Sequence, residues 1–164
     1  MTKGKIYFQE TQRFKQIWIW LLLIGINAQF IFAIVYQVML GHPFGNNPMS
    51  NMGVLISFII SLLLSLLFFS LRLDTVIDEK GIYVRFFPFH KQAILYSRDR
   101  IKNAYVRTYK PIREFGGWGL RGGAYNVSGN KGLQLEFKDG GKFLIGTNQP
   151  EKMQEAINEF LKGS

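Results

Sequence analysis

The stretch Ile17-Trp-Ile-Trp-Leu-Leu-Leu-Ile-Gly-Ile-Asn-Ala-Gln-Phe-Ile-Phe-Ala-Ile-Val-Tyr-Gln-Val-Met-Leu40 contains no charged residue. As an α-helix, at about 1.5 Å per residue, it is about 36 Å long and could cross a bilayer with some tilt. A second uncharged stretch, residues 53–71, is about 28 Å long by the same rise. Turn-forming residues separate the two stretches, so the sequence predicts a helical hairpin. A cleaved signal peptide fits less well, because its apolar region is only about 7–15 residues long.

Basic residues flank the predicted hairpin, and its connecting loop contains no Lys or Arg. The flanking basic residues are Lys3, Lys5, Arg13, Lys15 and Arg72. By the positive-inside rule we expect both termini in the cytoplasm. The expected division of the chain is a cytoplasmic N-terminal segment (1–16), transmembrane helix 1 (17–40), an extracytoplasmic loop (41–52), transmembrane helix 2 (53–71) and a cytoplasmic domain (72–164).

Small and amide side chains recur every four residues in both spans, which places them on one side of each helix. They are Gly25, Gln29, Ala33 and Gln37 in the first span and Gly53, Ser57, Ser61 and Ser65 in the second. Small residues allow close helix packing, and amides can bond to serine hydroxyls. We therefore predict that these residues form the interface between the two helices, with Gln29 near Ser61 and Gln37 near Gly53. Asn27 lies about 200° from Gly25 around the helix, so it either bonds to local backbone or meets a second copy.

After Arg72 the hydrophobic pattern changes to the alternation typical of half-buried strands, most clearly in Leu133-Gln-Leu-Glu-Phe137. Strands are expected at 73–78, 81–87, 92–96, 102–109, 118–126, 133–137 and 142–145. A final helix is expected after the N-cap Asn148, with an apolar face of Met153, Ile157, Phe160 and Leu161 and an end at Gly163. The predicted fold class is α+β: the membrane hairpin, then a seven-stranded antiparallel barrel or sandwich capped by a C-terminal helix.

The chain resembles the bacterial pleckstrin-homology-like (PH-like) membrane proteins that have two N-terminal transmembrane helices. The resemblance is carried by Gly116-Gly-Trp-Gly-Leu-Arg121, Ala124-Tyr-Asn-Val127, Phe143-Leu-Ile-Gly146 and Glu10-Thr-Gln-Arg-Phe14. It covers nearly the whole chain and implies a PH-like fold in a bacterial cytoplasmic membrane. It implies little about activity, because this fold hosts many binding roles.

The sequence lacks the residue patterns that several classes of enzyme and cofactor-binding protein require. Gly117, Gly119 and Gly122 match the G-x-G-x-x-G spacing of dinucleotide-binding proteins, but extended-type residues follow where that motif needs a helix. The chain has no cysteine, and His42 and His90 are expected on opposite sides of the membrane. The carboxylates form no pair suited to acid–base chemistry. We therefore predict no catalytic, cofactor-binding or metal site, and no small-molecule substrate.

Two of the predicted turns combine apolar residues with cations. In a simple strand meander, the turns at 87–91, 109–115 and 139–142 would face the membrane. The first two have the composition expected of a surface resting on anionic lipid. We name their candidate contact residues the rim: Phe87, Phe89, Lys91, Lys110, Ile112 and Arg113. The alternative is ordinary solvated loops whose apolar residues turn into the core.

The predicted function is a membrane-anchored, non-enzymatic binding or scaffold module whose β domain engages a protein partner or the anionic lipid surface. The alternative is a subunit of a larger membrane assembly whose contacts are made by the hairpin. The net charge of +9 also suggests nucleic acid, but no nucleic-acid-binding motif accompanies it. Eukaryotic PH domains that bind phosphoinositides use a basic loop between their first two strands. Here that loop, residues 78–81, is short and acidic on balance, which argues against specific inositol-lipid binding.

Overall fold

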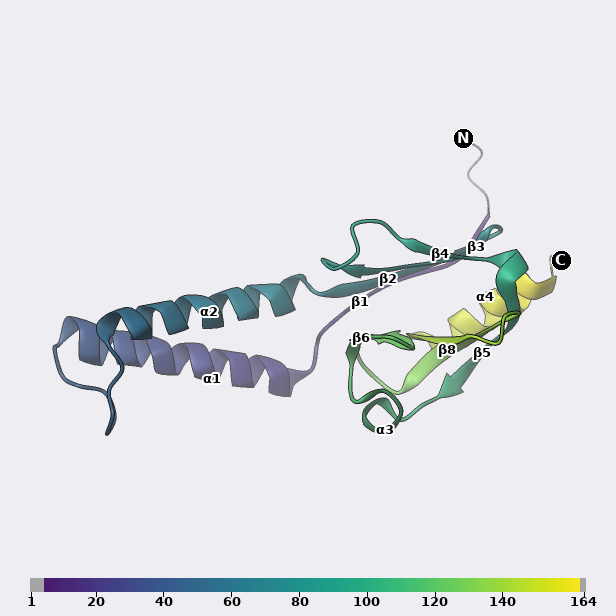
Figure 1. Cartoon of the computed structure of the whole chain (residues 1–164). Coiled ribbons are helices and arrows are strands. Elements are labelled where there is room, and N and C mark those ends of the chain that lie inside the picture. Colours follow the sequence, from purple (N-terminus) through teal and green to yellow (C-terminus); the bar gives the residue numbers. More distant parts are fainter. Residues whose placement is uncertain (1–4, 163–164) are drawn as a thin grey trace. The chain divides into compact units, whose positions relative to one another are not determined.

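A computed structural model describes residues 5–162, so Lys3 and Gly163 lie outside the described part of the chain (Figure 1). The chain forms two compact units. The helical unit comprises Lys15–Ser70. The β unit combines the described residues up to Phe14 with those from Leu71 onward, so it is built from both ends of the sequence.

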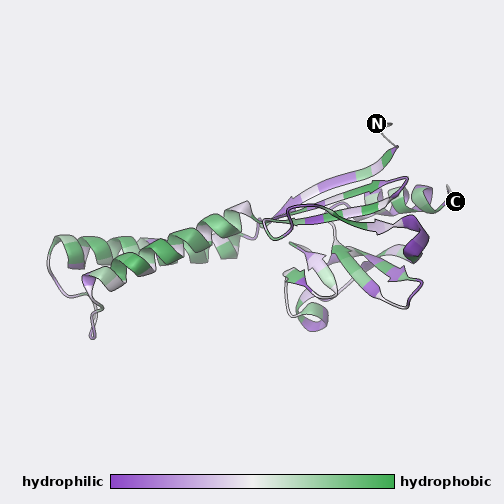
Figure 2. Cartoon of the chain, turned by 45° about the horizontal axis from the view of Figure 1, so that its top comes forward, coloured by the Kyte–Doolittle hydropathy of each residue, from purple (hydrophilic) through white to green (hydrophobic). Residues whose placement is uncertain are grey.

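The helical unit is the predicted hairpin. Helix α1 (Ile17–Ala33) continues into a π-helical segment, η1 (Ile34–Met39), and α2 (Asn51–Ser70) returns alongside it. Both helices are long and apolar enough to cross a membrane. Figure 2 shows hydrophobic residues along almost the whole of each helix, as a lipid-facing surface requires.

The interface between the two helices differs from the predicted one. Ala33, Gln37 and Ser61 are buried and Gly53, Ser57 and Ser65 are partly buried, but Gly25 and Gln29 are exposed. In their place the first half of α1 buries Ile19 and Leu23. A stripe of residues spaced by four advances about 40° around the helix at each step, or about 120° from Gly25 to Gln37. One partner helix cannot cover so wide an arc, so only the later half of the predicted stripe is buried.

Hydrogen bonds in the hairpin also differ from expectation. Asn27 Nδ2 donates to the Leu23 carbonyl at 2.8 Å, as local bonding predicts, and also to Ser65 Oγ at 2.9 Å. Asn27 is therefore part of the interface. Gln37 Nε2 donates to the Met49 carbonyl at 2.7 Å, and its Oε1 accepts from the Phe44 N–H at 3.2 Å. Gln37 thus holds the connecting loop rather than pairing with Gly53.

The β unit contains two sheets. The first has the strand order β1-β2-β3-β4 and the second β5-β8-β9-β7-β6. The elements are β1 (Ile6–Arg13), β2 (Arg72–Asp78), β3 (Gly81–Phe87), β4 (Ile94–Ser97), η2 (Arg98–Arg100), β5 (Ile101–Thr108), α3 (Pro111–Phe115), β6 (Gly119–Arg121), β7 (Ala124–Asn126), β8 (Lys131–Phe137), β9 (Lys142–Gly146) and α4 (Pro150–Lys162). The α+β class is confirmed. The seven-stranded antiparallel barrel is wrong: residues 5–162 form nine strands without a closed barrel, and β7 pairs in parallel with β9.

Strand β1 was not predicted, and it moves the domain boundary. It pairs along its length with β2, so the β domain begins before the hairpin and not at residue 72. The inward side chains of β1 include two polar ones, Glu10 and Gln12, which interrupt the apolar alternation that identifies a strand from sequence. The hairpin is therefore an insertion between two paired strands.

A second difference from the predicted strands changes the end of the β unit at which one turn lies. Residues 118–126 were predicted as one strand but form two, β6 and β7, joined by Gly122 and Gly123. This extra reversal changes the direction of the strands that follow. The turn at 139–142 consequently lies beside η2, where the Lys138 N–H donates to the Arg100 carbonyl at 3.0 Å, and not beside the rim residues.

The core of the β unit lies between its sheets and α4. Helix α4 buries Met153, Ala156, Ile157 and Phe160, whereas the predicted core residue Leu161 is exposed. Full burial of each large apolar side chain contributes about 1.5–3 kcal/mol before entropy costs. These contacts make α4 a structural part of the unit.

Strand β1 also caps the segment that leads into α4. The carboxylate of Glu10, 5% exposed, accepts from the Thr147 hydroxyl at 2.8 Å and from the Asn148 N–H at 2.9 Å. Gln12 Nε2 donates to the Gly146 carbonyl. The side chain of Asn148, the predicted N-cap, instead bonds with Ser128. The first strand thereby joins the last two elements of the chain.

Candidate functional site

The strands that lead to and from the hairpin end side by side, and we call this part of the β unit the exit end. Arg13, the last residue of β1, lies directly opposite Arg72, the first residue of β2, and Arg72 lies opposite Phe87 of β3. Residues directly opposite one another project from the same face of a sheet. The Arg72 guanidinium lies 4.9 Å from the Phe87 ring centroid, a cation–π contact. Two arginines and an aromatic ring therefore form one row across the exit end.

The next row inward contains the acid that partly neutralises these cations. Asp74 accepts from the Thr11 hydroxyl at 2.8 Å and from Arg85 Nε and Nη2 at 3.0 and 2.7 Å. The same carboxylate lies 3.4 Å from Arg72 Nε. The Arg13 side chain has no hydrogen bond or ion pair to any residue within 5–162. The Asp74 carboxylate thus pairs with two arginines, while Arg13 has no counter-ion among residues 5–162, which leaves this face positively charged.

Asp74 and its partners Thr11, Arg72 and Arg85 line a shallow hollow of about 310 Å³ on the first sheet. Its lining includes Arg72, Asp74, Tyr83, Arg85 and Ala93. Ala93 belongs to the segment between β3 and β4, which also carries the rim residues Phe89 and Lys91.

Three rim residues lie at the end of β3 and in the loop that follows it: Phe87 is the last residue of the strand, and Phe89 and Lys91 are in the loop. A turn in which the His90 N–H donates to the Phe86 carbonyl at 2.9 Å directs the chain outward. Phe89 is 57% exposed, and Phe87 and Lys91 are exposed as well. Large exposed aromatic rings beside a cation suit contact with a lipid surface or a partner protein.

The other three rim residues lie in α3 or directly before it: Lys110 is the N-cap residue, and Ile112 and Arg113 are in the helix. Pro111 begins this helix and Gly116, at φ 70°, ends it in the left-handed conformation that glycine adopts without strain. Ile112 is 69% exposed, and Lys110 and Arg113 are exposed on either side of it. The short helix and its N-cap residue therefore place one apolar and two cationic side chains next to one another at the surface.

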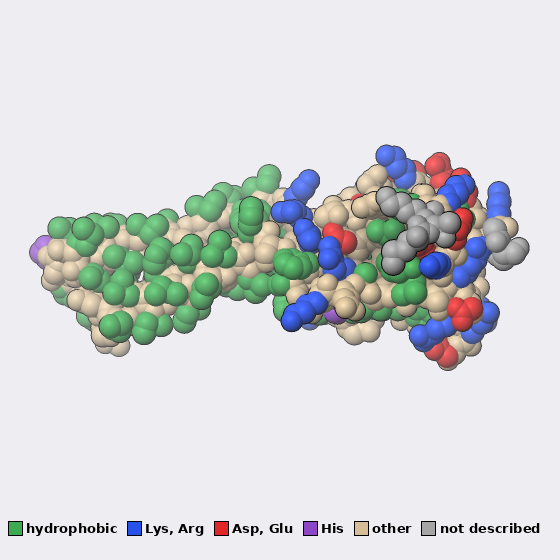
Figure 3. Space-filling view, turned by 90° about the horizontal axis from the view of Figure 1, so that it is seen from above, with side chains coloured by type: hydrophobic (Ala, Val, Ile, Leu, Met, Phe, Trp, Pro, Cys, Tyr) green, Lys and Arg blue, Asp and Glu red, His purple; other side chains and the backbone are tan. Residues whose placement is uncertain are grey.

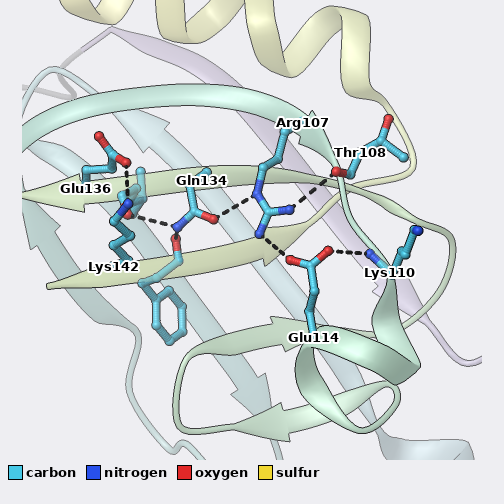
Figure 4. A network of polar contacts seen from close by, with 9 residues as sticks. Arg107, Thr108, Lys110, Glu114, Gln134, Glu136 and Lys142 are labelled. Carbon is cyan, nitrogen blue, oxygen red and sulfur yellow. Dashed lines mark hydrogen bonds and ion pairs between the residues drawn. The ribbon is translucent and has the colours of Figure 1, made fainter.

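A polar network fixes α3 against the second sheet (Figure 4). Glu114 accepts from the Lys110 N–H at 2.7 Å and from Arg107 Nη2 at 2.7 Å. Arg107 Nε in turn donates to Gln134 Oε1 at 3.0 Å, and Gln134 Nε2 donates to the Phe143 carbonyl at 3.2 Å. The hydrogen bond from Arg107 lowers the pKa of Glu114 below its ordinary value. Because Lys110 contributes only its backbone here, its ammonium group is left available.

All six rim residues are exposed, so the interpretation that their apolar members turn into the core is wrong for Phe87, Phe89 and Ile112. In Figure 1, α3 and the β3–β4 loop both lie toward the end of the β unit at which β1 ends and β2 begins. Figure 3 shows Lys and Arg side chains distributed over the β unit, several of them gathered at that end. Sequence reasoning used Arg13 and Arg72 only for orientation, because the pairing of β1 with β2 was not foreseen.

The structure also shows the surroundings of Gly122 and His90, which the sequence analysis considered as motif and ligand residues. Gly122 is followed by β7 and not by a helix, so the structural context of a dinucleotide motif does not occur there. His90 packs against the Tyr125 ring, with centroids 5.3 Å apart. Within residues 5–162, no three His, Cys, Asp or Glu side chains cluster as metal ligands would.

Comparison with known proteins adds no further assignment. No protein-family model matches this sequence, and no curated protein matches it. The chain is therefore described by its architecture: two apolar helices, a β-rich unit and a C-terminal helix.

Proposed function

We propose that this protein is a membrane-anchored, non-enzymatic binding module, in which the hairpin crosses a bacterial cytoplasmic membrane and the exit end of a PH-like β domain binds the anionic lipid surface. The observation that carries the proposal is the pairing of Arg13 with Arg72 at the points where the chain runs into and out of the apolar helices. Like charges placed directly opposite one another destabilise a sheet. An anionic phosphate between them would remove that cost.

The connecting segments keep this end near the helix termini. Phe14, Lys15 and Gln16 connect β1 to α1, and Leu71 alone connects α2 to β2. An extended residue spans at most about 3.6 Å, so the strand ends cannot move far from the ends of the helices. With the helices inserted, Arg13 and Arg72 lie within reach of lipid headgroups.

The rim extends this contact over a wider surface. Each Lys or Arg near an anionic leaflet contributes about 1 kcal/mol of binding free energy. The exposed rings of Phe87 and Phe89 and the side chain of Ile112 add apolar contact at the interface. The basic residues that flank the hairpin favour the cytoplasmic leaflet, which is the anionic one.

The absence of cysteine from the sequence allows single-cysteine probes to test the proposal. The full chain would be reconstituted in nanodiscs, with an environment-sensitive fluorophore on Ile112→Cys in α3 or, as control, on Lys80→Cys in the β2–β3 turn. We expect anionic lipid, but not zwitterionic lipid, to shift the emission of the Ile112 probe to the blue. Added salt should reverse the shift, because it screens surface charges. Equal behaviour of the two probes would refute the lipid-binding role.

The alternative function is a subunit of a larger membrane assembly joined through the hairpin. It is supported by a different observation, the exposed amide of Gln29 in α1. The two functions are compatible, since they use different units of the chain.

A further inference from the structure

The two arginines at the exit end have guanidinium groups with unused hydrogen-bond donors. The Arg13 side chain makes no hydrogen bond or ion pair with the described residues. Arg72 Nε lies 3.4 Å from the Asp74 carboxylate but is buried without a hydrogen-bond partner among residues 5–162. A guanidinium presents several N–H donors in a planar fork. Two such forks are therefore available to an acceptor from outside the chain.

The acid beside the pair is already neutralised by a third arginine. Asp74 Oδ2 accepts from Arg85 Nε and Nη2 at 3.0 and 2.7 Å, and Asp74 Oδ1 accepts from the Thr11 hydroxyl at 2.8 Å. Hydrogen bonds between a guanidinium and a carboxylate are among the strong ones. The pair of Asp74 and Arg85 is neutral in sum, so Arg13 and Arg72 contribute a net charge of +2 to this face.

The strand register holds these two charges close together. Arg13 and Arg72 lie directly opposite one another, which places their Cβ atoms about 4.5–5.5 Å apart on the same face of the sheet. The Arg72 guanidinium packs on the Phe87 ring, 4.9 Å from its centroid, and also lines the hollow of about 310 Å³. A group of the size of a phosphate therefore has space beside Arg72 and can contact both side chains.

We propose that the Arg13–Arg72 pair binds a phosphate monoester, and that its ligand in the membrane is a lipid whose headgroup is an unsubstituted phosphate. A phosphate monoester carries a charge of about −1.5 to −2 at neutral pH and has three acceptor oxygens. A second ester bond, as in phosphatidylglycerol, removes one of these oxygens and leaves a smaller charge. The two guanidinium forks and their net charge therefore match the monoester better. The inference rests on the proposed function, because it specifies which anionic headgroup the exit end selects.

Competition between two lipids in one sample tests this selection. The full chain in neutral detergent would be incubated with equimolar phosphatidate and phosphatidylglycerol of the same acyl chains, and the retained lipids counted by mass spectrometry. At about pH 7.5 we expect at least about 5-fold more phosphatidate, as one additional charge contact predicts. At about pH 5.5 the ratio should fall, because a phosphate monoester gains its second proton near a pKa of about 6. A ratio near one at the higher pH, or a ratio that does not fall at the lower pH, overturns the inference.

The pH comparison uses a ratio so that changes in the protein itself cancel. Both lipids meet the same chain in the same sample, so a titrating side chain alters the retention of both. The ratio then reports the difference between the two headgroups.

Substitution of Arg13 locates the selection in the sequence. Arg13→Gln removes one guanidinium from an exposed position and should bring the lipid ratio near one. Arg13→Lys, which keeps the charge but not the planar fork, should retain part of the preference. Lys80→Gln, which removes a cation from the β2–β3 turn, is the matched control and should leave the ratio unchanged. Equal effects of Arg13→Gln and Lys80→Gln overturn the site.

A soluble phosphate ester carries the same chemical group, and glycerol 3-phosphate distinguishes the two sources. It has the phosphate monoester without acyl chains. If a large excess leaves phosphatidate bound, the lipid is confirmed as the ligand. If an equal concentration displaces phosphatidate, the phosphate site stands and its assignment to a lipid is overturned.

Failure of the proposed function gives a different result. If neither anionic lipid is retained more than the zwitterionic phosphatidylcholine, the exit end does not bind anionic lipid, and the proposed function fails together with this inference. If both anionic lipids are retained equally and more than phosphatidylcholine, the proposed function stands and the headgroup selection alone is overturned.

Discussion

Arg13 lies directly opposite Arg72 in the β1–β2 pair, although the whole helical unit separates them in sequence. Their like charges oppose the pairing on which the sheet depends. Arg13→Glu should therefore stabilise the folded chain by about 0.2–1 kcal/mol, because opposite charges attract across strands. The same change should weaken contact with anionic lipid. Chemical denaturation in neutral detergent measures the change in stability, and the Ile112 fluorophore assay measures the change in lipid contact. In both, the neutral variant Arg13→Gln should lie between the native chain and Arg13→Glu. If Arg13→Glu changed stability and lipid contact in the same direction, the proposed role of the Arg13–Arg72 pair in lipid binding would be contradicted.

The register of β1 and β2 predicts that the β domain folds without its helices. Replacing residues 15–70 by Asn-Gly joins Phe14 to Leu71 through a two-residue turn of the kind that favours hairpins. We call this chain the loop-closed domain and expect it to be soluble, monomeric and cooperatively folded. Circular dichroism and thermal unfolding would measure this.

A chain of residues 72–164 is the informative control, because it lacks β1. Without β1, one edge of β2 is unpaired, and the Asn148 N–H and Thr147 hydroxyl lose their acceptor, Glu10. We expect this shorter chain to aggregate or to unfold at a lower temperature. Equal stability of the two chains would show that β1 is dispensable.

Glu10 should contribute more to stability than its position near the N-terminus suggests. Glu10→Ala leaves the buried Thr147 hydroxyl and the partly buried Asn148 N–H without their acceptor and should cost about 1–3 kcal/mol. Gln9→Ala changes the adjacent, outward-facing residue and should cost less than about 0.5 kcal/mol. Denaturant titration of the loop-closed domain compares the two. Similar costs would argue against the capping role.

The rim predicts a position-dependent effect of charge. Lys110→Glu combined with Arg113→Glu should reduce partitioning of the loop-closed domain onto anionic vesicles by at least about 30-fold, the equivalent of about 1 kcal/mol per removed cation. Lys80→Glu combined with Lys138→Glu makes the same change of charge in two turns away from the rim. Vesicle flotation should show little loss for this control pair. Equal losses would mean that net charge alone determines binding.

Tyr96 predicts a loss of stability in alkaline solution. Its ring packs against Phe137 and Phe143, with centroids 5.4 and 5.1 Å away, and burial raises the pKa of its phenol from 10.0 to about 12. Above pH 10 the unfolded phenol loses its proton while the folded one retains it, so unfolding becomes more favourable as the pH rises to about 12. Tyr96→Phe should reduce this slope and leave the pH dependence below 10 unchanged. Denaturation midpoints across the range would measure it, and an unchanged slope would refute the assignment.

The elements predicted correctly are those whose evidence is local. Apolar length alone identifies the hairpin, and the alternation of Leu133-Gln-Leu-Glu-Phe137 identifies β8. Strand β1 was missed because its inward Glu10 and Gln12 look like surface residues until their partners at 146–148 are known. A buried polar side chain is recognisable only together with the distant group that satisfies it.

The candidate site shows the same division. Turn composition suggested the rim as one of two possibilities, and its residues are exposed in the structure. The like-charged pair of Arg13 and Arg72 depends on strand pairing and was not. The turn at Gly122 and Gly123 was not foreseen. It reverses the strands that follow, so residues 139–142 lie beside η2 and not beside the rim, where they were predicted. The exposure of Gln29 followed from the rotation of a four-residue repeat around the helix.

If the helices cross a membrane as proposed, the position of the hairpin between two paired strands makes folding of the β domain depend on the number of crossings. If only one helix entered the bilayer, Ile6–Arg13 would be held on one side and its sheet partner Arg72–Asp78 on the other. The edge strand would then be missing, and the preparation would resemble the truncated 72–164 chain. On this proposal a complete sheet can form only after an even number of crossings during biosynthesis, so a folded β domain excludes a chain in which a single helix was inserted.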